Sequence, residues 1–241
     1  MNQVIKRAHE KLLKFAEKQY GQNALLQAWD DFMVIEDEDF SLDTPHMQVF
    51  LSWFFFDWHP TPVESEMRRV EIDLRPIAQV YLEKLSNHQD HLLVNNLKQC
   101  CATPFSFYNI LSVCPGNEFT LWDILAEKKV DVTEHSELNN AEVGNILFTK
   151  VIKFGNQVVL EGSSPILFPS IENRRILMLQ REIYDEFSSF EPDVLKAFDH
   201  EMLEIYHVIF HRLYDLAMPK LQNSSGHQFL FRHFKYAIEF P

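Results

Sequence analysis

The sequence predicts an α+β protein that is mainly helical, with a small β-barrel segment of SH3-like or OB-like kind in its middle. Apolar residues recur at helical spacing before residue 103 and after residue 172, and short runs bounded by turn residues lie between. Glycine is scarce (6) and phenylalanine abundant (21), which favours packed helices over tight turns. We therefore predict a helical N-terminal region over 1–103, a barrel-like region over 104–169 and a helical C-terminal region over 170–241.

Helix start and stop signals divide the N-terminal region. Gly21 is a suitable stop for a first helix, because glycine readily adopts the left-handed conformation that ends helices. Thr44-Pro45 has the residue types of an N-cap and first turn, and it opens a helix that ends near Trp58, before a proline-rich stop. The other helices of this region are predicted over 3–20, 25–29, 63–86 (with a break at Pro76) and 90–102.

Residues 50–58 form the strongest apolar run of the chain. Seven of the nine residues are apolar, six of these are aromatic, and Asp57 is the one charged residue. The run is shorter than the roughly 20 residues that span a bilayer, so we expect it to be buried in the protein or against a partner. Its candidate binding residues are Asp57, Trp53 and Trp58.

Asp57 is open to two interpretations. A carboxylate in an apolar run is a possible general acid, but a buried charge is tolerated only when it is paired. We favour the structural role, in which Asp57 caps the helix or binds an arginine such as Arg68 or Arg69.

The middle region is predicted to consist of short strands. A β-rich run begins after Pro104, residues 114–117 (Cys-Pro-Gly-Asn) are a turn signal, and Gly155-Asn156-Gln157 is a hairpin turn between two apolar runs. A small, partly open barrel is the natural arrangement, because closure limits the exposed strand edges. After it, helices are predicted over 172–187, 193–217 and 226–238.

The sharpest candidate for chemistry is one face of the helix near residue 200. His200, Glu204, His207 and His211 stand at positions i, i+4, i+7 and i+11, which places all four on one side of a helix. Glu204 and His207 form a Glu-x-x-His step of the kind found in di-iron bundles, but the other ligands of such a site are missing. We favour a solvated or hydrogen-bonded face, and a divalent-metal site made by these four residues is the alternative.

Composition argues against several function classes. The net charge is −13 and the basic residues are scattered, so no nucleic-acid partner is predicted. Neither a secretory leader nor a segment of transmembrane length is found, which predicts a cytoplasmic protein without a membrane partner. The acidic run at 30–43 has no calcium-loop spacing and is predicted to be a solvated loop. Cys100, Cys101 and Cys114 are predicted to be free thiols.

Three motifs together resemble a family of uncharacterised bacterial proteins that often carry a SEC-C metal-binding motif. They are Trp-Phe-x-Phe-Asp-Trp at 53–58, Ser-x-Tyr-x-Ile-x-x-Val-x-Pro-Gly at 106–116 and Leu-x-Asp-Ile-Leu at 121–125. The resemblance covers roughly residues 45–170. The cysteine-rich SEC-C hook itself is absent from this chain, so the resemblance implies neither a zinc hook nor a known reaction.

These observations favour a non-catalytic interaction or adaptor module with a protein partner and no cofactor. Nucleophile motifs, a phosphate-binding glycine loop and a complete metal-ligand set are all missing from the sequence. The alternative is a metal-dependent enzyme that uses the histidine and glutamate face around residue 204. The sequence leaves the oligomeric state open.

Overall fold

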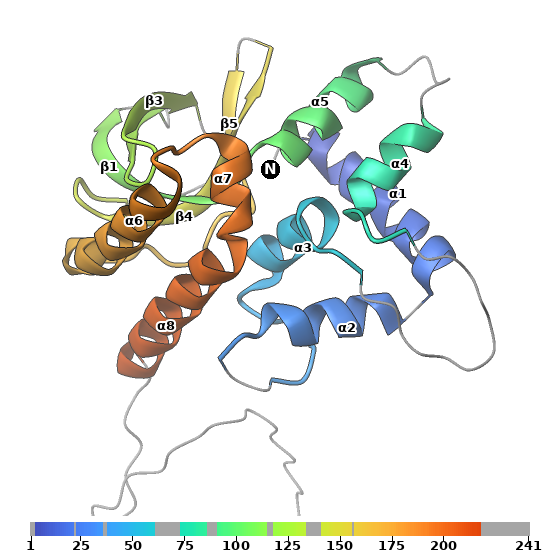
Figure 1. Cartoon of the computed structure of the whole chain (residues 1–241), viewed down its shortest axis with the longest axis horizontal. Coiled ribbons are helices and arrows are strands. Elements are labelled where there is room, and N and C mark those ends of the chain that lie inside the picture. Colours follow the sequence, from blue (N-terminus) through green and yellow to red (C-terminus); the bar gives the residue numbers. More distant parts are fainter. Residues whose placement is uncertain are drawn as a thin grey trace, which may run out of the picture.

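The computed structural model describes residues 3–21, 23–35, 38–60, 73–85, 91–114, 118–133, 141–155 and 157–217. In this part of the chain, five helices come first, a five-stranded antiparallel sheet follows, and further helices end the fold (Figure 1). The α+β class and the helix–strand–helix order agree with the prediction. None of the described helices is both long and apolar enough to cross a bilayer.

The N-terminal helices surround one central helix, α3. In Figure 1, α3 lies between the other N-terminal helices and the C-terminal helix α8. Gly21, with φ of +86°, ends the first helix as predicted, and its N–H donates to the Glu17 carbonyl at 3.0 Å. The five helices are α1 (Gln3–Tyr20), α2 (Asn23–Phe32), α3 (Met47–Phe56), α4 (Ile77–Lys84) and α5 (His91–Ala102).

Two local predictions in this region need correction. Helix α3 begins at Met47 rather than at Thr44-Pro45, and its N-cap is His46, whose backbone N–H donates to Thr44 Oγ1 at 3.4 Å. The acidic run at 30–43 is not all loop, because its first two residues lie in the last turn of α2. One of them, Asp31, accepts a hydrogen bond from Trp58 Nε1 at 2.8 Å, so it holds the end of the aromatic run.

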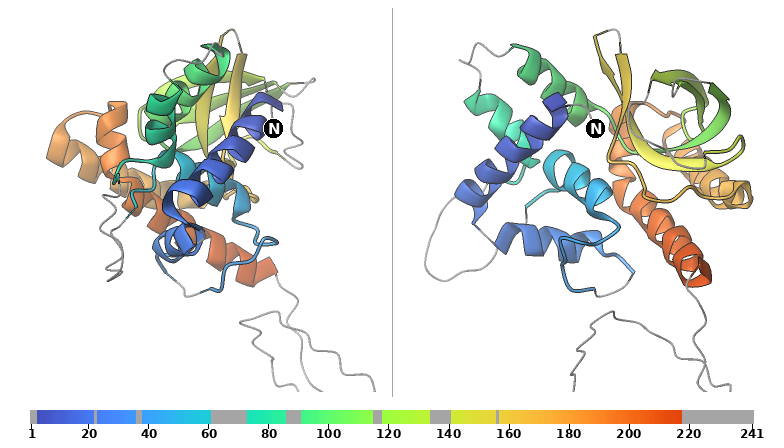
Figure 2. Two further views of the ribbon diagram at one scale, coloured as in Figure 1. Left: turned by 90° about the vertical axis from the view of Figure 1, so that its right-hand side faces the viewer. Right: turned by 180° about the vertical axis from the view of Figure 1, so that it is seen from behind.

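The sheet curls into a partly closed barrel. Its strands are β1 (Ser106–Cys114), β2 (Glu118–Asp123), β3 (Lys128–Thr133), β4 (Ile146–Phe154) and β5 (Gln157–Glu161), in the order β3-β2-β1-β4-β5. The edge strands β3 and β5 approach each other, as the rear view in Figure 2 shows. A bulge in β1 between Ile110 and Ser112 bends this strand, which helps the sheet to curl.

The C-terminal region differs from the prediction at one point. A single helix was expected over 193–217, but the chain forms α7 (Pro192–Ala197) and α8 (Asp199–Ala217) with a break at Phe198. The break lets Phe198 turn inward against Phe187 of α6 (Asn173–Phe187), with ring centres 5.7 Å apart. Burial of this aromatic ring compensates for the lost helical continuity. The helix predicted over 226–238 lies outside the described residues.

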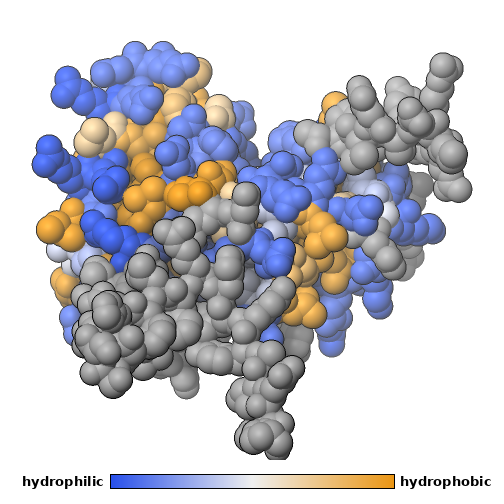
Figure 3. All heavy atoms as spheres, turned by 90° about the horizontal axis from the view of Figure 1, so that it is seen from below, coloured by the Kyte–Doolittle hydropathy of each residue, from blue (hydrophilic) through white to orange (hydrophobic). Residues whose placement is uncertain are grey.

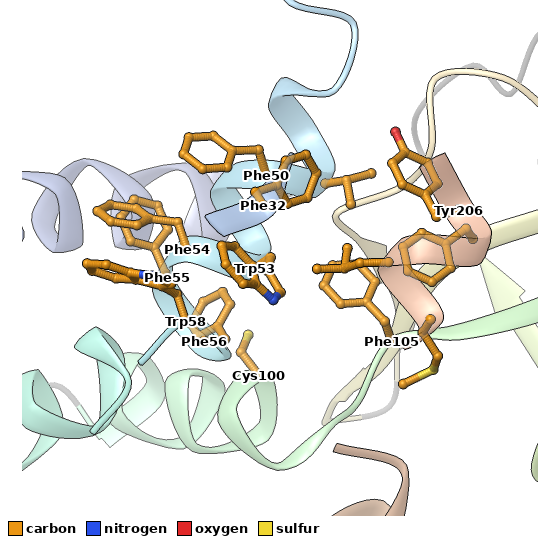
Figure 4. Packing of buried hydrophobic residues seen from close by; sticks show 14 of the residues in the cluster. Phe32, Phe50, Trp53, Phe54, Phe55, Phe56, Trp58, Cys100, Phe105 and Tyr206 are labelled. Carbon is orange, nitrogen blue, oxygen red and sulfur yellow. The ribbon is translucent and has the colours of Figure 1, made fainter. Parts of the chain in front are cut away.

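Helix α3 supplies the centre of the main hydrophobic core. Phe50, Phe54, Phe55 and Phe56 are each at most 1% exposed, and Figure 4 shows these rings packed together, with Phe105 and Tyr206 facing α3 from across the core. Each fully buried ring of this size stabilises the fold by roughly 1.5–3 kcal/mol. The predicted burial of the aromatic run is therefore confirmed, and its partner is the protein itself.

The close approach of α3 to the end of β5 yields a testable prediction. Gly162 has φ of +67°, and a Cβ there would stand 2.5 Å from Ser52 Cβ. Gly162→Ala should lower the free energy of unfolding by about 2–4 kcal/mol, because backbone strain adds to overpacking. The measurement is urea denaturation. Gly144→Ala is the control, since Gly144 has φ of +91° but open space around it, and it should lose only about 1–2 kcal/mol. Equal losses in both variants would contradict the packing argument.

Candidate functional site

Helices α3 and α8 run antiparallel, and each end of their contact holds polar groups. At one end, Trp53 Nε1 of α3 donates to the carboxylate of Asp199, the first residue of α8. At the other end, His46 contacts Tyr206, His207 and His211 on the following turns of α8. The packing of two helices thus creates two separate polar clusters, which we call the ionic junction and the histidine cluster.

The histidine cluster consists of His46, His207 and His211. Its ring centres lie 5.1 Å (His46–His207), 5.7 Å (His46–His211) and 5.8 Å (His207–His211) apart. One ring nitrogen from each residue lies within 4.8 Å of the other two. His46 and His207 are buried and His211 is partly exposed, so the cluster sits just beneath the surface.

Burial keeps two of these imidazoles neutral. Desolvation, followed by the neighbouring His207 and His211, lowers the pKa of His46 to about 2. Desolvation, followed by His211, lowers the pKa of His207 to about 3. Neutral imidazole is the form that binds metals, because protonation removes the free lone pair.

Hydrogen bonding distinguishes His46 from His207. The Nδ1 atom of His46 lies 2.7 Å from the Tyr206 hydroxyl, which leaves Nε2 as the nitrogen available to a ligand. Within the described part of the chain, neither ring nitrogen of the fully buried His207 has a hydrogen-bonding partner of ordinary geometry. The Phe32 backbone is near enough to favour the protonated ring slightly, but desolvation outweighs it. His207 is therefore a buried polar side chain whose nitrogens are unsatisfied.

The cluster differs from the set predicted from sequence. His207 and His211 come together as predicted, but His200 and Glu204 are exposed and stand outside it. On this face of α8, Phe32 packs against His207, and His46 packs against His207 and His211. His46 was missed because it lies 160 residues from Tyr206, and its only sequence signal was its place directly before the aromatic helix.

The ionic junction is built on Asp57. Its Oδ1 accepts from Lys196 Nζ of α7 at 2.6 Å, and its Oδ2 accepts from Lys150 Nζ of β4. Lys150 is fully buried, and its ammonium lies over the rings of Phe105 and Phe56, 4.9 and 5.4 Å from their centres. The structural role favoured for Asp57 fits this geometry, with two lysines as partners. Arg68 and Arg69, the partners considered from sequence, lie outside the described residues.

A second carboxylate, Asp199, borders this junction. The residue as a whole is partly exposed, but its carboxyl group is enclosed by protein. Desolvation, followed by the charge of Asp57, raises the pKa of Asp199 to about 7, and the Trp53 hydrogen bond and the two lysines oppose this shift. The indole N–H of Trp53 thus donates to Asp199, and that of Trp58 donates to Asp31. Both tryptophan N–H groups are therefore used within the fold.

The thiols near the junction are not activated. Cys100 is buried and Cys101 partly buried, and both are free, as predicted. Burial raises the pKa of Cys101 to about 11 and that of Cys100 further, so neither is a thiolate at neutral pH. The side chain of Cys114 lies outside the described residues.

Comparisons with known proteins add no family or fold relative. No family model, curated protein or solved structure matches the chain. The functional argument therefore depends on the geometry of the two clusters.

Asp199 gives a prediction about pH. Its pKa of about 7 is higher than the roughly 3.9 of an unfolded aspartate, so the native state holds the proton more tightly and stability falls as pH rises from about 4 to 7. Asp199→Asn removes this titration. As pH rises from 5 to 8, the unfolding free energy of wild type should therefore fall by a few kcal/mol more than that of the variant, which is the order of magnitude that such a pKa shift implies.

Urea denaturation at several pH values measures this difference. Asp193→Asn, which changes an exposed carboxylate on the neighbouring helix α7, is the control and should follow the wild-type profile. A constant difference between Asp199→Asn and wild type over this pH range would contradict the prediction.

Proposed function

We propose that the protein binds one divalent transition-metal ion at the histidine cluster. The observation that carries the proposal is the convergence of three imidazoles, two of them buried and neutral, around His207, whose nitrogens are unsatisfied. An unsatisfied buried polar group costs about 1–3 kcal/mol, and coordination removes that penalty. Imidazole ligands suit zinc, copper, iron, cobalt and nickel.

The distances support this reading. Nitrogens about 2 Å from a tetrahedral zinc ion place the centres of their rings about 5 Å apart, close to the 5.1–5.8 Å of the cluster. The donor atoms, within 4.8 Å of each other, would close by at most about 1.5 Å to reach tetrahedral spacing. His207 and His211 have the i, i+4 spacing with which helices present two imidazoles to one ion.

The surroundings supply the support that metal ligands need. The Tyr206 hydroxyl holds Nδ1 of His46, which fixes the ring and leaves Nε2 for the metal. Tyr206 itself stacks on Phe148 of β4, with ring centres 4.9 Å apart. Helix α8, which carries His207 and His211, is therefore tied to the sheet, and the ion would join this helix to His46 before α3.

Metal uptake by tag-free, full-length protein tests the proposal. We expect one Co(II) or Zn(II) per chain by elemental analysis, and a rise in melting temperature with metal concentration. His207→Phe should abolish uptake without lowering the stability of the metal-free protein, because it replaces an unsatisfied polar ring by an apolar one.

Matched controls separate the cluster from the set predicted from sequence. His200 and Glu204 lie on the same helix but are exposed, so the His200→Gln and Glu204→Gln variants should bind metal as wild type does. His46→Gln should weaken binding at least about 100-fold, since it removes a ligand. Metal-free folded wild type, or equal losses from His200→Gln and His207→Phe, would overturn the proposal.

A second candidate function is the non-catalytic interaction module, in the cytoplasm, that the sequence favours. Its support is the outer face of α6, where Leu177, Met178 and Tyr184 are 49%, 66% and 54% exposed. Figure 3 shows apolar side chains among polar ones on the side of the molecule that carries α6 and α8. In this proposal the barrel is a small module of SH3-like or OB-like kind, the chain is related to the uncharacterised bacterial family that often carries a SEC-C motif, and α6 binds a protein partner.

The α6 face can be tested without knowing the partner. Because exposed apolar side chains mark contact surfaces, Leu177→Glu combined with Met178→Glu should reduce co-purification of a specific protein from cell extract at least about tenfold. Arg174→Glu on the same helix is the control for added negative charge. Unchanged recovery of every partner, with native circular dichroism, would exclude this face.

A further inference from the structure

The outer face of helix α6 presents its side chains in two neighbouring stripes. Leu177, Tyr184 and Phe187 form the apolar stripe. Arg181 and Asp185 form the charged stripe beside it. Resting on the proposed role of α6 in binding a protein partner, we propose that this partner is a second copy of the chain, which packs its α6 antiparallel to the first around a two-fold axis.

Both stripes are accessible to a second molecule. Leu177 and Tyr184 are about half exposed, and Phe187 is 45% exposed. The side chains of Arg181 and Asp185 are 83% and 68% exposed. In Figures 1 and 2, α6 lies at the periphery of the molecule, on the side away from α1, α2 and α4. Another protein can therefore reach this face without a rearrangement of the fold.

The charged stripe is complementary to itself. Arg181 Nε lies 3.7 Å from Asp185 Oδ2, one turn further along the helix. A two-fold rotation reverses the helix direction, so an axis near positions 182–183 places Arg181 of each copy opposite Asp185 of the other. The exposed pair alone contributes at most about 1 kcal/mol, but four alternating charges that leave bulk water together attract each other more strongly. An unrelated partner would have to carry the reverse order of charges independently, whereas a second copy carries it by symmetry.

The same axis pairs the apolar stripe with its own equivalent. Positions equally distant from the axis face each other, so Leu177 of one copy lies within about 1.5 Å, measured along the helix, of the level of Phe187 of the other. Phe187 is held from behind by Phe198, with ring centres 5.7 Å apart. The Tyr184 rings of the two copies meet close to the axis. One antiparallel arrangement therefore brings together both the apolar and the charged side chains of this face.

The size of the contact sets its strength. Helix α6 has 15 residues and is about 22 Å long, so a contact made by one helix pair is at the small end of protein interfaces, where transient complexes are found. The net charge of −13 on each copy also opposes association. We therefore expect a reversible dimer with a dissociation constant on the order of 10–1,000 µM.

Sedimentation velocity of tag-free, full-length protein tests the proposal, at chain concentrations from about 5 to 500 µM that bracket this range. Wild type should shift reversibly from one to two chains per particle. Arg181→Glu and Asp185→Lys should each weaken self-association at least about tenfold, because each change turns both Arg–Asp contacts into like-charge contacts. Circular dichroism checks that both variants remain folded.

Mixing these two variants gives the sharpest result. In an equimolar mixture of Arg181→Glu and Asp185→Lys, the introduced glutamate faces the introduced lysine, and the unchanged arginine faces the unchanged aspartate. The mixture should therefore dimerise at least as well as wild type, although neither variant does so alone. Lys11→Glu and Glu10→Lys make the same charge changes on the exposed face of α1, on the other side of the molecule, and should self-associate as wild type does.

The outcomes separate this proposal from the general one. A monomer at every concentration, with Leu177-dependent and Met178-dependent recovery of a different protein, overturns the second copy and leaves α6 as a contact surface. A monomer without any such recovery overturns both. A dimer that survives Arg181→Glu and Asp185→Lys, or variants that associate no better together than apart, overturns the antiparallel α6 contact.

Discussion

The ion pairs of Asp57 hold the three parts of the chain together. Asp57 ends the aromatic helix α3, Lys150 belongs to the sheet and Lys196 to the C-terminal helices, and both ammonium groups bind the one carboxylate. Because Lys150 is fully buried, removing its partner would leave an isolated buried charge and would lower the free energy of unfolding by about 3–5 kcal/mol. The carboxylate between two lysines therefore fixes where α3 meets both neighbours, in addition to the hydrophobic packing.

The position of the histidine cluster follows from that constraint. Asp57 and His46 flank opposite ends of α3, and Asp199 and His207 lie along α8, so the register that the ionic junction sets also brings the imidazoles together. A shift of α3 along α8 by one turn, about 5.4 Å, would separate His46 from His207 and His211. Two polar clusters of different chemistry thus depend on one antiparallel helix contact.

Much of the architecture was predictable from local sequence signals. The bounds of α1 follow from helical spacing and Gly21, the hairpin of β4 and β5 from its turn at Gly155, and the burial of α3 from six aromatic residues in nine. The errors lie where tertiary packing overrode local preference. The chain breaks between α7 and α8 because Phe198 gains more by packing on Phe187 than by continuing a helix, and periodicity carries no information about that contact.

The site was predictable only in part, and for the same reason. The sequence by itself determined that His207 and His211 share a helical face, that the aromatic run is buried and that Asp57 needs a partner. Only the tertiary structure decided that His46 completes the cluster, that His200 and Glu204 remain in solvent, and that two lysines neutralise Asp57. Spacing along a helix specifies which side chains point the same way, whereas burial and charge pairing depend on segments that meet only in the folded chain.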